Sequence, residues 1–483
     1  MGATSPLLAV GSGVVVPKRL TEALETAVEL AGLFEAHGAR LYLVGGVVRD
    51  AVLGRLGPGA DLDFTTDALP SLTEDILSSW ADAVWSQGKR FGTIGAERHR
   101  RRFEVTTHRA EAYAPSSRKP KVKFSTALEA DLSRRDFTVN AMALSLPDLK
   151  LVDPFDGVAD LAAKRLRTPL APEVSFTDDP LRMLRAARFI AGYNLVPEPG
   201  LVAAVTSLHT RLDIVSDERV RDELDKLIVV PDPSAGLSFL VETGLAEEFL
   251  PELPALALEQ DPLHRHKDVL AHTIAVVERA KPDRIVRLAA LFHDIGKPKT
   301  RSFGPGGTVT FHHHELVGAR MTRDRMRALR YSAEDIEKVS RLVELHLRFH
   351  TYAMGWTDSA VRRYVRDAGD LLAPLNELTR ADCTTSNPAR AWSLTERMDS
   401  FERRLSELRA KEELAAIRPD LDGRDVMEHL GIRPGTLVGR ALAHLLEARL
   451  EEGPHSREEA LRLLDEWWAS QPESQSGSPE RVD

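Results

Sequence analysis

Hydrophobic and polar positions follow two different repeats along this chain. From about residue 40 to 165, short runs rich in β-branched and aromatic residues alternate with amphipathic stretches, as in an α/β or α+β region. Beyond that point, apolar residues recur at helical spacing and strand-like runs disappear. The pattern predicts an α+β fold, with a small mixed head followed by an all-helical remainder. The strand-like runs are Leu41–Val44, Phe64–Thr66 and Phe103–Thr107, and the expected helices cover 177–230, 234–250, 266–297, 315–331, 333–350 and 358–383.

Length and composition limit the class of protein. A chain of 483 residues is too long for one ordinary core and suggests about three or four domains. Its single cysteine, Cys383, excludes an intrachain disulfide framework and a zinc ribbon, which favours a cytoplasmic location. Residues 1–20 lack a basic segment ahead of their apolar run, and no uncharged apolar stretch reaches membrane-spanning length. We therefore expect a soluble protein with no membrane partner.

Charge is unevenly distributed. The net charge is −9, which argues against a protein that coats nucleic acid indiscriminately. Between Gly88 and Ser125, however, eleven Lys and Arg residues stand against three Glu. This segment offers a basic face for a nucleic acid, although a solvated hairpin with a loop explains the same charges.

The segment LYLVGGVVRDAVLG runs from a strand-like stretch through two glycines into a helical pattern. Gly45 and Gly46 allow backbone amides to approach a phosphate group at the start of that helix. Arg49, one turn further, can add a charge-assisted contact to the same phosphate. The segment therefore predicts a triphosphate site.

Two carboxylates follow in the segment DLDF. Asp61 and Asp63 stand two residues apart in a strand-like run, so both point to one face of the strand and can hold a pair of Mg²⁺ ions. Glu104, in the strand-like run FEVTT, is a candidate third carboxylate. An ordinary outward-facing strand residue explains Glu104 equally well.

Two arginine-rich segments are candidates for nucleotide recognition. In RRDFTVNAMAL, Arg135 can reach a triphosphate, while Asp136 and Asn140 can orient the turn. In DDPLRMLRAARF, a carboxylate and arginines recur every three residues on a predicted helix. A carboxylate can accept from the exocyclic amine of cytosine or adenine, and a guanidinium can donate to ring acceptors. A solvated ion pair is the simpler alternative for these residues, which are Asp179, Arg182, Arg185 and Arg188.

Histidines concentrate in the second half of the chain. LFHDIGK places His293 beside Asp294 late in an apolar helix, with His272 in the preceding helix and Asp382 far downstream. Such a set favours a mixed His/Asp site for a divalent metal, to which the segment FHHHE and the helix of His346 can add ligands. A single histidine on a helix is usually structural, so only the whole set carries this prediction.

Taken in order, five segments resemble the motifs of one family, the bacterial class II tRNA nucleotidyltransferases and poly(A) polymerases of the DNA polymerase β superfamily. They are GGVVRD with DLD, RRDFTVNAMA, DPFDGVADL, DDPLR and ERVRDELDKL. The family usually has Glu before its base-reading Asp, whereas this chain has Asp178. That difference leaves a helix-capping role open for the position.

The resemblance implies roles for the residues above. Asp61 and Asp63 would hold Mg²⁺, and the incoming CTP or ATP would contact Gly46, Arg49, Arg135, Asp179, Arg182, Arg185 and Arg188. The basic run near Arg118 lies where such enzymes keep a flexible loop. The histidine set resembles the HD phosphohydrolase superfamily, which implies His272, His293, Asp294 and Asp382 as ligands of a second divalent metal, with His314 and His346 as further candidates.

The expected activity is template-independent addition of CCA to tRNA 3′ ends with release of pyrophosphate. The motifs leave open a poly(A) polymerase and an enzyme that adds only CC or only A. An HD phosphohydrolase with an inert head and a tRNA-binding module without activity are the less favoured alternatives. The expected domains are a flexible tail (1–20), a catalytic head (21–165), a neck with the base-reading motif (166–260), an HD domain (261–390), a helical tail (391–470) and a disordered end (471–483).

Overall fold

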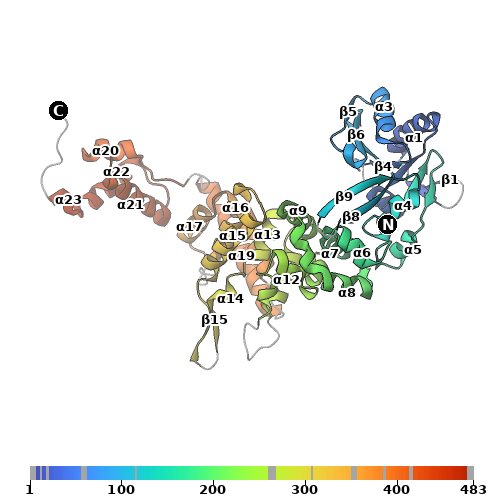
Figure 1. Ribbon diagram of the computed structural model, residues 1–483. Helices are drawn as coiled ribbons and strands as arrows, with labels where there is room; N and C mark the ends of the chain where they lie inside the picture. Colours follow the sequence, from blue (N-terminus) through green and yellow to red (C-terminus); the bar gives the residue numbers. More distant parts are fainter. Residues whose placement is uncertain are drawn as a thin grey trace. The chain divides into compact units, whose positions relative to one another are not determined.

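A computed structural model of the chain describes residues 7–10, 14–17, 21–55, 62–114, 117–258, 268–305, 308–349, 356–383, 388–412 and 417–475. The chain divides into two compact units, Met1–Pro254 and Ala255–Asp483 (Figure 1). The first unit holds a mixed sheet and helices, and the second is mostly helical. This is the α+β fold predicted from the hydrophobic pattern.

The head of the first unit is built on a seven-stranded sheet in the order β11-β10-β3-β4-β7-β6-β5. Strands β4 and β7 pair in parallel, and the other neighbouring strands are antiparallel. All three predicted strand runs are present. The strands are β3 (Leu41–Val44), β4 (Leu62–Thr66), β5 (Ala83–Trp85), β6 (Thr93–Arg98), β7 (Arg101–Thr107), β10 (Ala143–Leu146) and β11 (Lys150–Val152).

Alternation along β4 and β7 gives the sheet one apolar and one polar face. Leu62, Phe64, Phe103 and Val105 are buried, while the residues between them include exposed carboxylates. The aromatic rings of Phe64 and Phe103 stack with centroids 6.2 Å apart, and the ring of Trp80 meets Phe103 edge-on at 5.2 Å. Apolar burial therefore fixes the strand register, which in turn fixes the direction of the carboxylates. The head helices are α1 (Thr21–Ala36), α2 (Gly46–Val52), α3 (Pro70–Trp80), α4 (Leu128–Ser133) and α5 (Gly157–Ala162).

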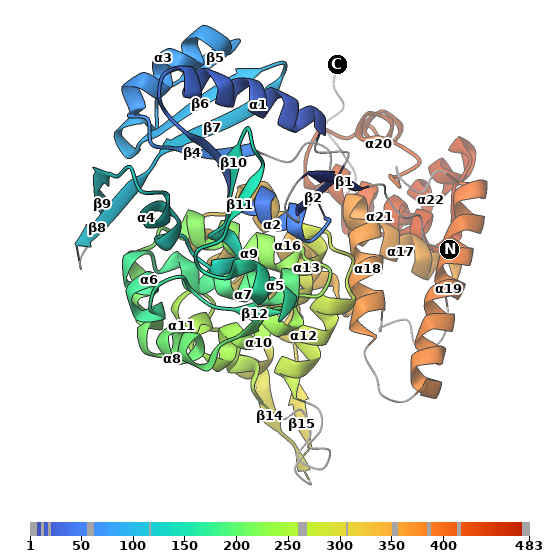
Figure 2. The ribbon, with the colours of Figure 1, turned by 90° about the vertical axis from the view of Figure 1, so that its right-hand side faces the viewer.

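A two-stranded ribbon, β8 (Arg109–Ala114) and β9 (Ser117–Phe124), projects beyond this sheet (Figure 2). It contains much of the basic segment noted above. The predicted N-terminal tail, 1–20, contains a short hairpin of β1 (Leu7–Val10) and β2 (Val14–Pro17), because consecutive β-branched valines favour extended structure. The remainder of that tail lies outside the described residues.

The rest of the first unit is a helical layer that carries the DDPLR segment. Helix α7 begins just after Pro180, whose fixed φ suits a helix start, and buried residues of α7 include Leu184, Phe189 and Ile190. A short parallel pair, β12 (Arg165–Leu166) with β13 (Val196–Pro197), also lies here. The helices are α6 (Pro172–Asp178), α7 (Leu181–Tyr193), α8 (Pro199–Leu208), α9 (Asp217–Ile228), α10 (Ser234–Glu242) and α11 (Leu245–Phe249).

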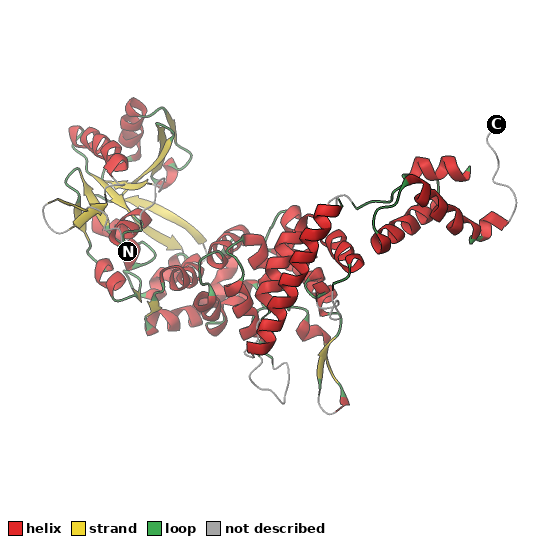
Figure 3. Ribbon diagram, turned by 180° about the vertical axis from the view of Figure 1, so that it is seen from behind, coloured by secondary structure: helices red, strands yellow, loops and turns green. Residues whose placement is uncertain are grey.

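In the second unit a hairpin interrupts the helices, so the prediction that strands disappear after residue 165 is wrong in detail. Strands β14 (Arg301–Phe303) and β15 (Val309–Phe311) flank the predicted Pro/Gly turn and project from the helices of the unit (Figure 3). Three-residue strands are too short to give a clear alternation. The helices around them are α12 (Val269–Arg279), α13 (Arg284–Phe292), α14 (Lys297–Thr300), α15 (His314–Ala328), α16 (Ala333–Leu345), α17 (Asp358–Ala368), α18 (Leu372–Asp382) and α19 (Pro388–Lys411).

The last helices have a core of their own, in which Val426, Ala441 and Leu464 are buried together. These helices are α20 (Gly423–Leu430), α21 (Thr436–Glu452), α22 (Arg457–Ala469) and α23 (Pro472–Gln475). Helix α23 falls at the start of the segment predicted to be disordered, and residues 476–483 lie outside the described residues. Among the described residues, no helix is both long enough and apolar enough to cross a membrane.

Candidate functional site

Two carboxylates lie side by side on the polar face of the head sheet. Asp63 of β4 is the direct neighbour of Glu104 of β7 in the parallel ladder, and both residues are exposed. Neighbouring strands lie about 4.8 Å apart, so their two negative charges repel each other unless a cation stands between them. The candidate third carboxylate thus shares a face with Asp63, while Asp61 lies outside the described residues.

Gly45 keeps open the space in front of Asp63. Its φ is +79°, a left-handed conformation that glycine adopts without strain. A Cβ atom at this position would stand 3.3 Å from Arg135 Nη1 and 3.8 Å from Asp63 Oδ2. The glycine, the carboxylate and the guanidinium therefore face one common space. A Cβ atom at the next residue, Gly46, would lie 3.4 Å from Arg49 Nη2.

Arg49 is buried and held by several partners. Its guanidinium donates to Asn140 Oδ1 at 2.6 Å and to Asp50 at 2.9 Å, and also to the hydroxyl of Tyr193. The guanidinium carbon lies 4.1 Å from the centroid of the Tyr193 ring. This arginine is therefore fixed in place beside the glycine turn.

A polar network continues from Arg49 into the helical layer. Asn140 donates to Asp136 Oδ1 at 2.9 Å, and Arg185 donates from Nε to Asp136 Oδ2 at 2.8 Å. Burial alone would raise the pKa of Asp136, but the positive charge of Arg185 and the hydrogen bonds from Asn140 and Arg185 hold that pKa well below its usual value. The network therefore contains an ionised buried carboxylate. It ends at Glu223 of α9, whose oxygens lie 3.5 Å from Arg185 and 2.8 Å from Arg188.

The predicted base-reading residues Asp179 and Arg182 differ in their surroundings, because Asp179 is partly exposed and Arg182 is buried. The Asp179 side chain accepts from the backbone amide of Leu181 at 3.2 Å and from Arg219 at 3.3 Å. Arg182 is buried instead, and donates to Ser175 Oγ at 2.8 Å and to the main-chain carbonyl of Arg134. The structure therefore pairs Asp179 with Arg219 of α9 rather than with Arg182.

Sequence reasoning missed four contributors to this site. Arg219 and Glu223 belong to the segment ERVRDELDKL, and their spacing of one helical turn was the available signal. Tyr193 shows no signal, because an aromatic residue on an apolar helix usually packs in the core. Asp131 is fully buried and pairs with Arg134 at 2.8 Å and with Arg135 Nη2 at 3.4 Å, so it positions the predicted triphosphate contact.

A second site lies inside the second unit, where histidine and aspartate side chains converge. His272 Nε2 lies 3.2 Å from His293 Nε2 and 3.1 Å from Asp382 Oδ1. Asp294 Oδ2 lies 3.2 Å from His293 Nε2, while its Oδ1 lies 3.4 Å from His314 Nε2. The described residues form two groups that can hold a metal ion, and both contain Asp294. These groups are His272, His293 and Asp294, and Asp294, His314 and His346.

Three of these histidines are oriented as metal ligands usually are. The Nδ1 atoms of His293, His314 and His346 lie 2.7, 2.8 and 2.6 Å from backbone carbonyl oxygens. Such contacts fix the ring so that Nε2 faces the cluster. His314 Nε2 is buried and makes no hydrogen bond, although the Asp294 oxygen lies within ion-pair distance. Burial, together with the nearby charge of His293, lowers the pKa of His346 to about 3, so its ring is the neutral form that binds metals. The donor set therefore fits a divalent metal.

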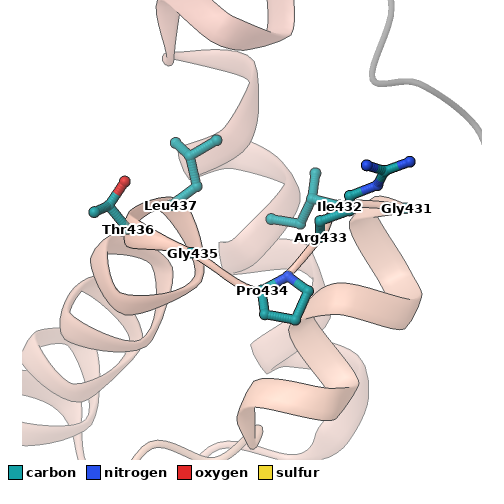
Figure 4. Close-up of a pocket in the computed structure, with 7 residues that line it drawn as sticks. All are labelled: Gly431, Ile432, Arg433, Pro434, Gly435, Thr436 and Leu437. Atoms are coloured by element: carbon teal, nitrogen blue, oxygen red, sulfur yellow. The ribbon is translucent and has the colours of Figure 1, made fainter.

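The surface hollows in the described part of the chain include the following two. One, of about 440 Å³, lies in the first unit between α2, α7 and α9. The other, of about 330 Å³, follows the turn from α20 to α21 and is lined by residues 431–437 (Figure 4). The second hollow contains one charged side chain, Arg433, among mostly apolar and glycine residues, which suits no particular chemistry.

Three segments of the chain match known domain families. Residues 41–167 match the poly(A) polymerase head domain, and residues 194–256 match the probable RNA- and SrmB-binding site of polymerase A. Residues 269–386 match the HD domain. Fold and site together define the class of protein: a polymerase-type nucleotidyltransferase head followed by helical regions that include an HD domain.

Two relatives cover most of the chain. The A-adding tRNA nucleotidyltransferase of Deinococcus radiodurans is 36% identical over 364 residues, which are 72% of this chain and 81% of the relative. The CC-adding tRNA nucleotidyltransferase of Thermus thermophilus is 32% identical over 456 residues, which are 91% of this chain and 96% of the relative. The chain belongs to the tRNA nucleotidyltransferase family, which confirms the resemblance drawn from the motifs.

The fold is also that of a solved structure, the Bacillus stearothermophilus CCA-adding enzyme in complex with CTP. The similar region covers 93% of this chain and 98% of the solved chain, with a TM-score of 0.67 and 23% sequence identity.

Proposed function

We propose that this protein adds CCA to the 3′ end of tRNA without a nucleic-acid template, using CTP and ATP and releasing pyrophosphate. The observation that carries the proposal is the space in front of Asp63, which Gly45 and Arg135 border and beside which Glu104 lies as the ladder neighbour of Asp63. A carboxylate pair beside a guanidinium suits a triphosphate and its metal ions. The relatives, which are named as A-adding and CC-adding enzymes, support tRNA as the acceptor.

Asp63, together with Asp61 and Glu104, would hold Mg²⁺. When bound, Mg²⁺ would activate the RNA 3′-hydroxyl and stabilise the charge of the departing pyrophosphate. The guanidiniums of Arg49 and Arg135 would bind the triphosphate, each held in place by buried partners. Gly45 and Gly46 would leave room for the phosphates to approach the backbone.

Asp179 would select the base. Its carboxylate can accept a hydrogen bond from the exocyclic amine of cytosine or adenine, whereas uracil and guanine present a carbonyl oxygen at the corresponding edge. Arg219 fixes this carboxylate by a direct hydrogen bond. Three arginines of α7 would act on the base indirectly, by fixing the position of this helix, because their guanidiniums contact protein groups. They are Arg182, Arg185 and Arg188.

The test is to incubate the protein and Mg²⁺ with tRNAs that end before C, after CC and after CCA, supplying each NTP separately and then together. Extension of both incomplete ends, with a stop at CCA, would support the proposal. Extension of only one incomplete end would mean a CC-adding or A-adding enzyme, and long A-only tails on any RNA would mean a poly(A) polymerase. Asp63→Asn and Glu104→Gln should each reduce kcat at least a hundredfold, while Glu97→Gln, on the neighbouring strand, serves as control.

A second activity is favoured by the His/Asp cluster in the second unit. We infer a divalent-metal phosphohydrolase, because a metal held by Asp294 and histidine nitrogens can activate water toward a phosphoester. The test measures bound metal by atomic emission and hydrolysis of 2′,3′-cyclic nucleotides by the full chain. His293→Ala with Asp294→Ala should remove both signals and leave nucleotide addition intact. Unchanged metal content would make the cluster structural.

We also infer a cytoplasmic location, because the single cysteine gives no disulfide framework and tRNA is the proposed acceptor.

A further inference from the structure

The hollow between α2, α7 and α9 has no assigned role, and its walls are chemically distinctive. Positive side chains reach it from three elements: Arg55 from just beyond α2, Arg188 from α7 and Lys226 from α9. Its aromatic wall is Tyr193, and its apolar part is formed by the segment that follows α9, residues 229–231. Cations beside an aromatic ring and an apolar surface suit a nucleotide unit, which has an anionic phosphate and a flat base.

The carboxylates near the hollow are already engaged. Asp50 accepts two hydrogen bonds from Arg49 at 2.9 Å and one from Tyr193 at 3.3 Å. Glu223 lies within 3.5 Å of three cations, which are Arg185, Arg188 and Lys226. Arg185 is also paired with Asp136, so two carboxylates face three cations and the wall formed by α7 and α9 keeps an excess of positive charge. That excess favours an anionic ligand.

The hollow is separate from the triphosphate site but adjacent to it. Gly46 is the first residue of α2 and lies next to the space in front of Asp63. Asp50 lies near the end of this helix and Arg55 lies beyond it, and each helical residue adds about 1.5 Å along the helix axis. Arg49, seated on the Tyr193 ring at 4.1 Å, stands between the two sites. A ligand in the hollow therefore leaves the triphosphate contacts unblocked.

We propose that this hollow binds a nucleotide unit of the RNA acceptor strand, with its backbone phosphate held by Arg55 and Lys226 and its base or ribose against Tyr193. The inference rests on the proposed function, since an RNA whose 3′-hydroxyl reaches the Asp63 space must place its preceding nucleotides close by. Lys226 has a side chain that is 57% exposed, so it is accessible to such a strand. The site would recognise the phosphate and any base, without sequence preference.

The experiment measures binding of a fluorescently labelled tRNA that lacks CCA to the full chain, by anisotropy at several salt concentrations, and the KM for CTP in parallel. Arg55→Ala and Lys226→Ala should each weaken RNA binding severalfold. Each should also reduce the slope of log affinity against log salt by about 0.7, the contribution of one phosphate contact on a single strand. The KM for CTP should stay within about twofold of the wild-type value, and Lys226→Arg should restore the slope.

Arg221→Ala is the matched control, because Arg221 lies on the same helix but pairs with its neighbour Asp222 at 2.8 Å and does not line the hollow. Variants that bind RNA like this control, with the same salt slope, would overturn the inference. So would a raised KM for CTP with unchanged RNA binding, which would make the hollow part of the nucleotide site. Failure of the proposed function is a different result, in which the wild-type protein incorporates neither CMP nor AMP.

Discussion

The ionised carboxylate of Asp136 offers the sharpest test of the polar network. Replacing Asp136 by Asn keeps its size but removes the charge that faces Arg185. Separating one partner from a buried ion pair costs about 3–5 kcal/mol. The Arg185 side chain is 31% exposed and Glu223 lies 3.5 Å away, so water and Glu223 compensate for part of the loss. We therefore expect the free energy of unfolding of the head to fall by about 2 kcal/mol at pH 7.

The pH dependence follows from the direction of the pKa shift. The pKa of Asp136 in the folded protein lies below the value of about 3.9 for an unfolded aspartate. Its stabilisation is therefore fully present above that pH and is lost as the pH falls toward the folded-state pKa. The difference in the free energy of unfolding between the wild type and Asp136→Asn should be constant from pH 8 to 5 and should become smaller only below about pH 4.

The assay is urea unfolding followed by hydrogen exchange of peptides from α7, which reports on the first unit alone. In an Arg185→Ala background, Asp136→Asn should cost clearly less, because the partner charge is already gone. A difference that changes between pH 8 and 6 would point to a histidine and refute the assignment to Asp136. If Asp136→Asn lowers the free energy of unfolding equally in the wild-type and Arg185→Ala backgrounds, the pairing of Asp136 with Arg185 is refuted.

Three further outcomes are expected. Gly45→Ala should raise the KM for CTP at least tenfold and lower the free energy of unfolding by about 1–2 kcal/mol. The reason is that a side chain at a positive φ would be strained and would crowd Arg135. An unchanged KM and kcat would mean that the phosphates bind elsewhere. Arg219→Ala should lower the preference for CTP over UTP about three- to tenfold in kcat/KM by freeing the Asp179 carboxylate, with partial recovery in Arg219→Lys; a loss of kcat without a change in preference would leave Arg219 a structural role. His314→Ala should lower the metal bound by the second unit while nucleotide addition stays constant, and retained metal measured by atomic emission would exclude it as a ligand.

Local patterns predicted the parts of the site that depend on a single element. Alternation in the LDFTT strand set the face of Asp63, and helical spacing in DDPLRMLRAARF placed its arginines near one another. The sequence left the pairing of Asp63 with Glu104 undetermined. This pairing requires β4 and β7 to be parallel neighbours in the sheet, although β5, β6 and a helix separate them along the chain. Register between distant strands is decided by burial of the apolar face, which sequence spacing alone does not fix.

Side-chain partners across elements were the hardest to predict. A carboxylate and an arginine three residues apart on a helix are natural partners, yet Asp179 pairs with Arg219, forty positions away. The reason is that Asp179 ends α6 in an extended conformation, which turns its side chain away from the face of Arg182. The β14–β15 hairpin was missed for a simpler reason, since each of its strands has three residues.

Helix α9 gives the segment ERVRDELDKL a physical role that its sequence does not state. Arg219 and Glu223 lie one turn apart on this helix, and they hold Asp179, Arg185 and Arg188 of the base-reading segment. A cation in the first turn of a helix is unfavourable to the helix dipole, so Arg219 is explained better by its contact with Asp179 than by helix stability. Arg219 and Glu223 would therefore act on nucleotide choice through the residues that they support, and substitutions of these two residues should change base preference without any direct contact to the nucleotide.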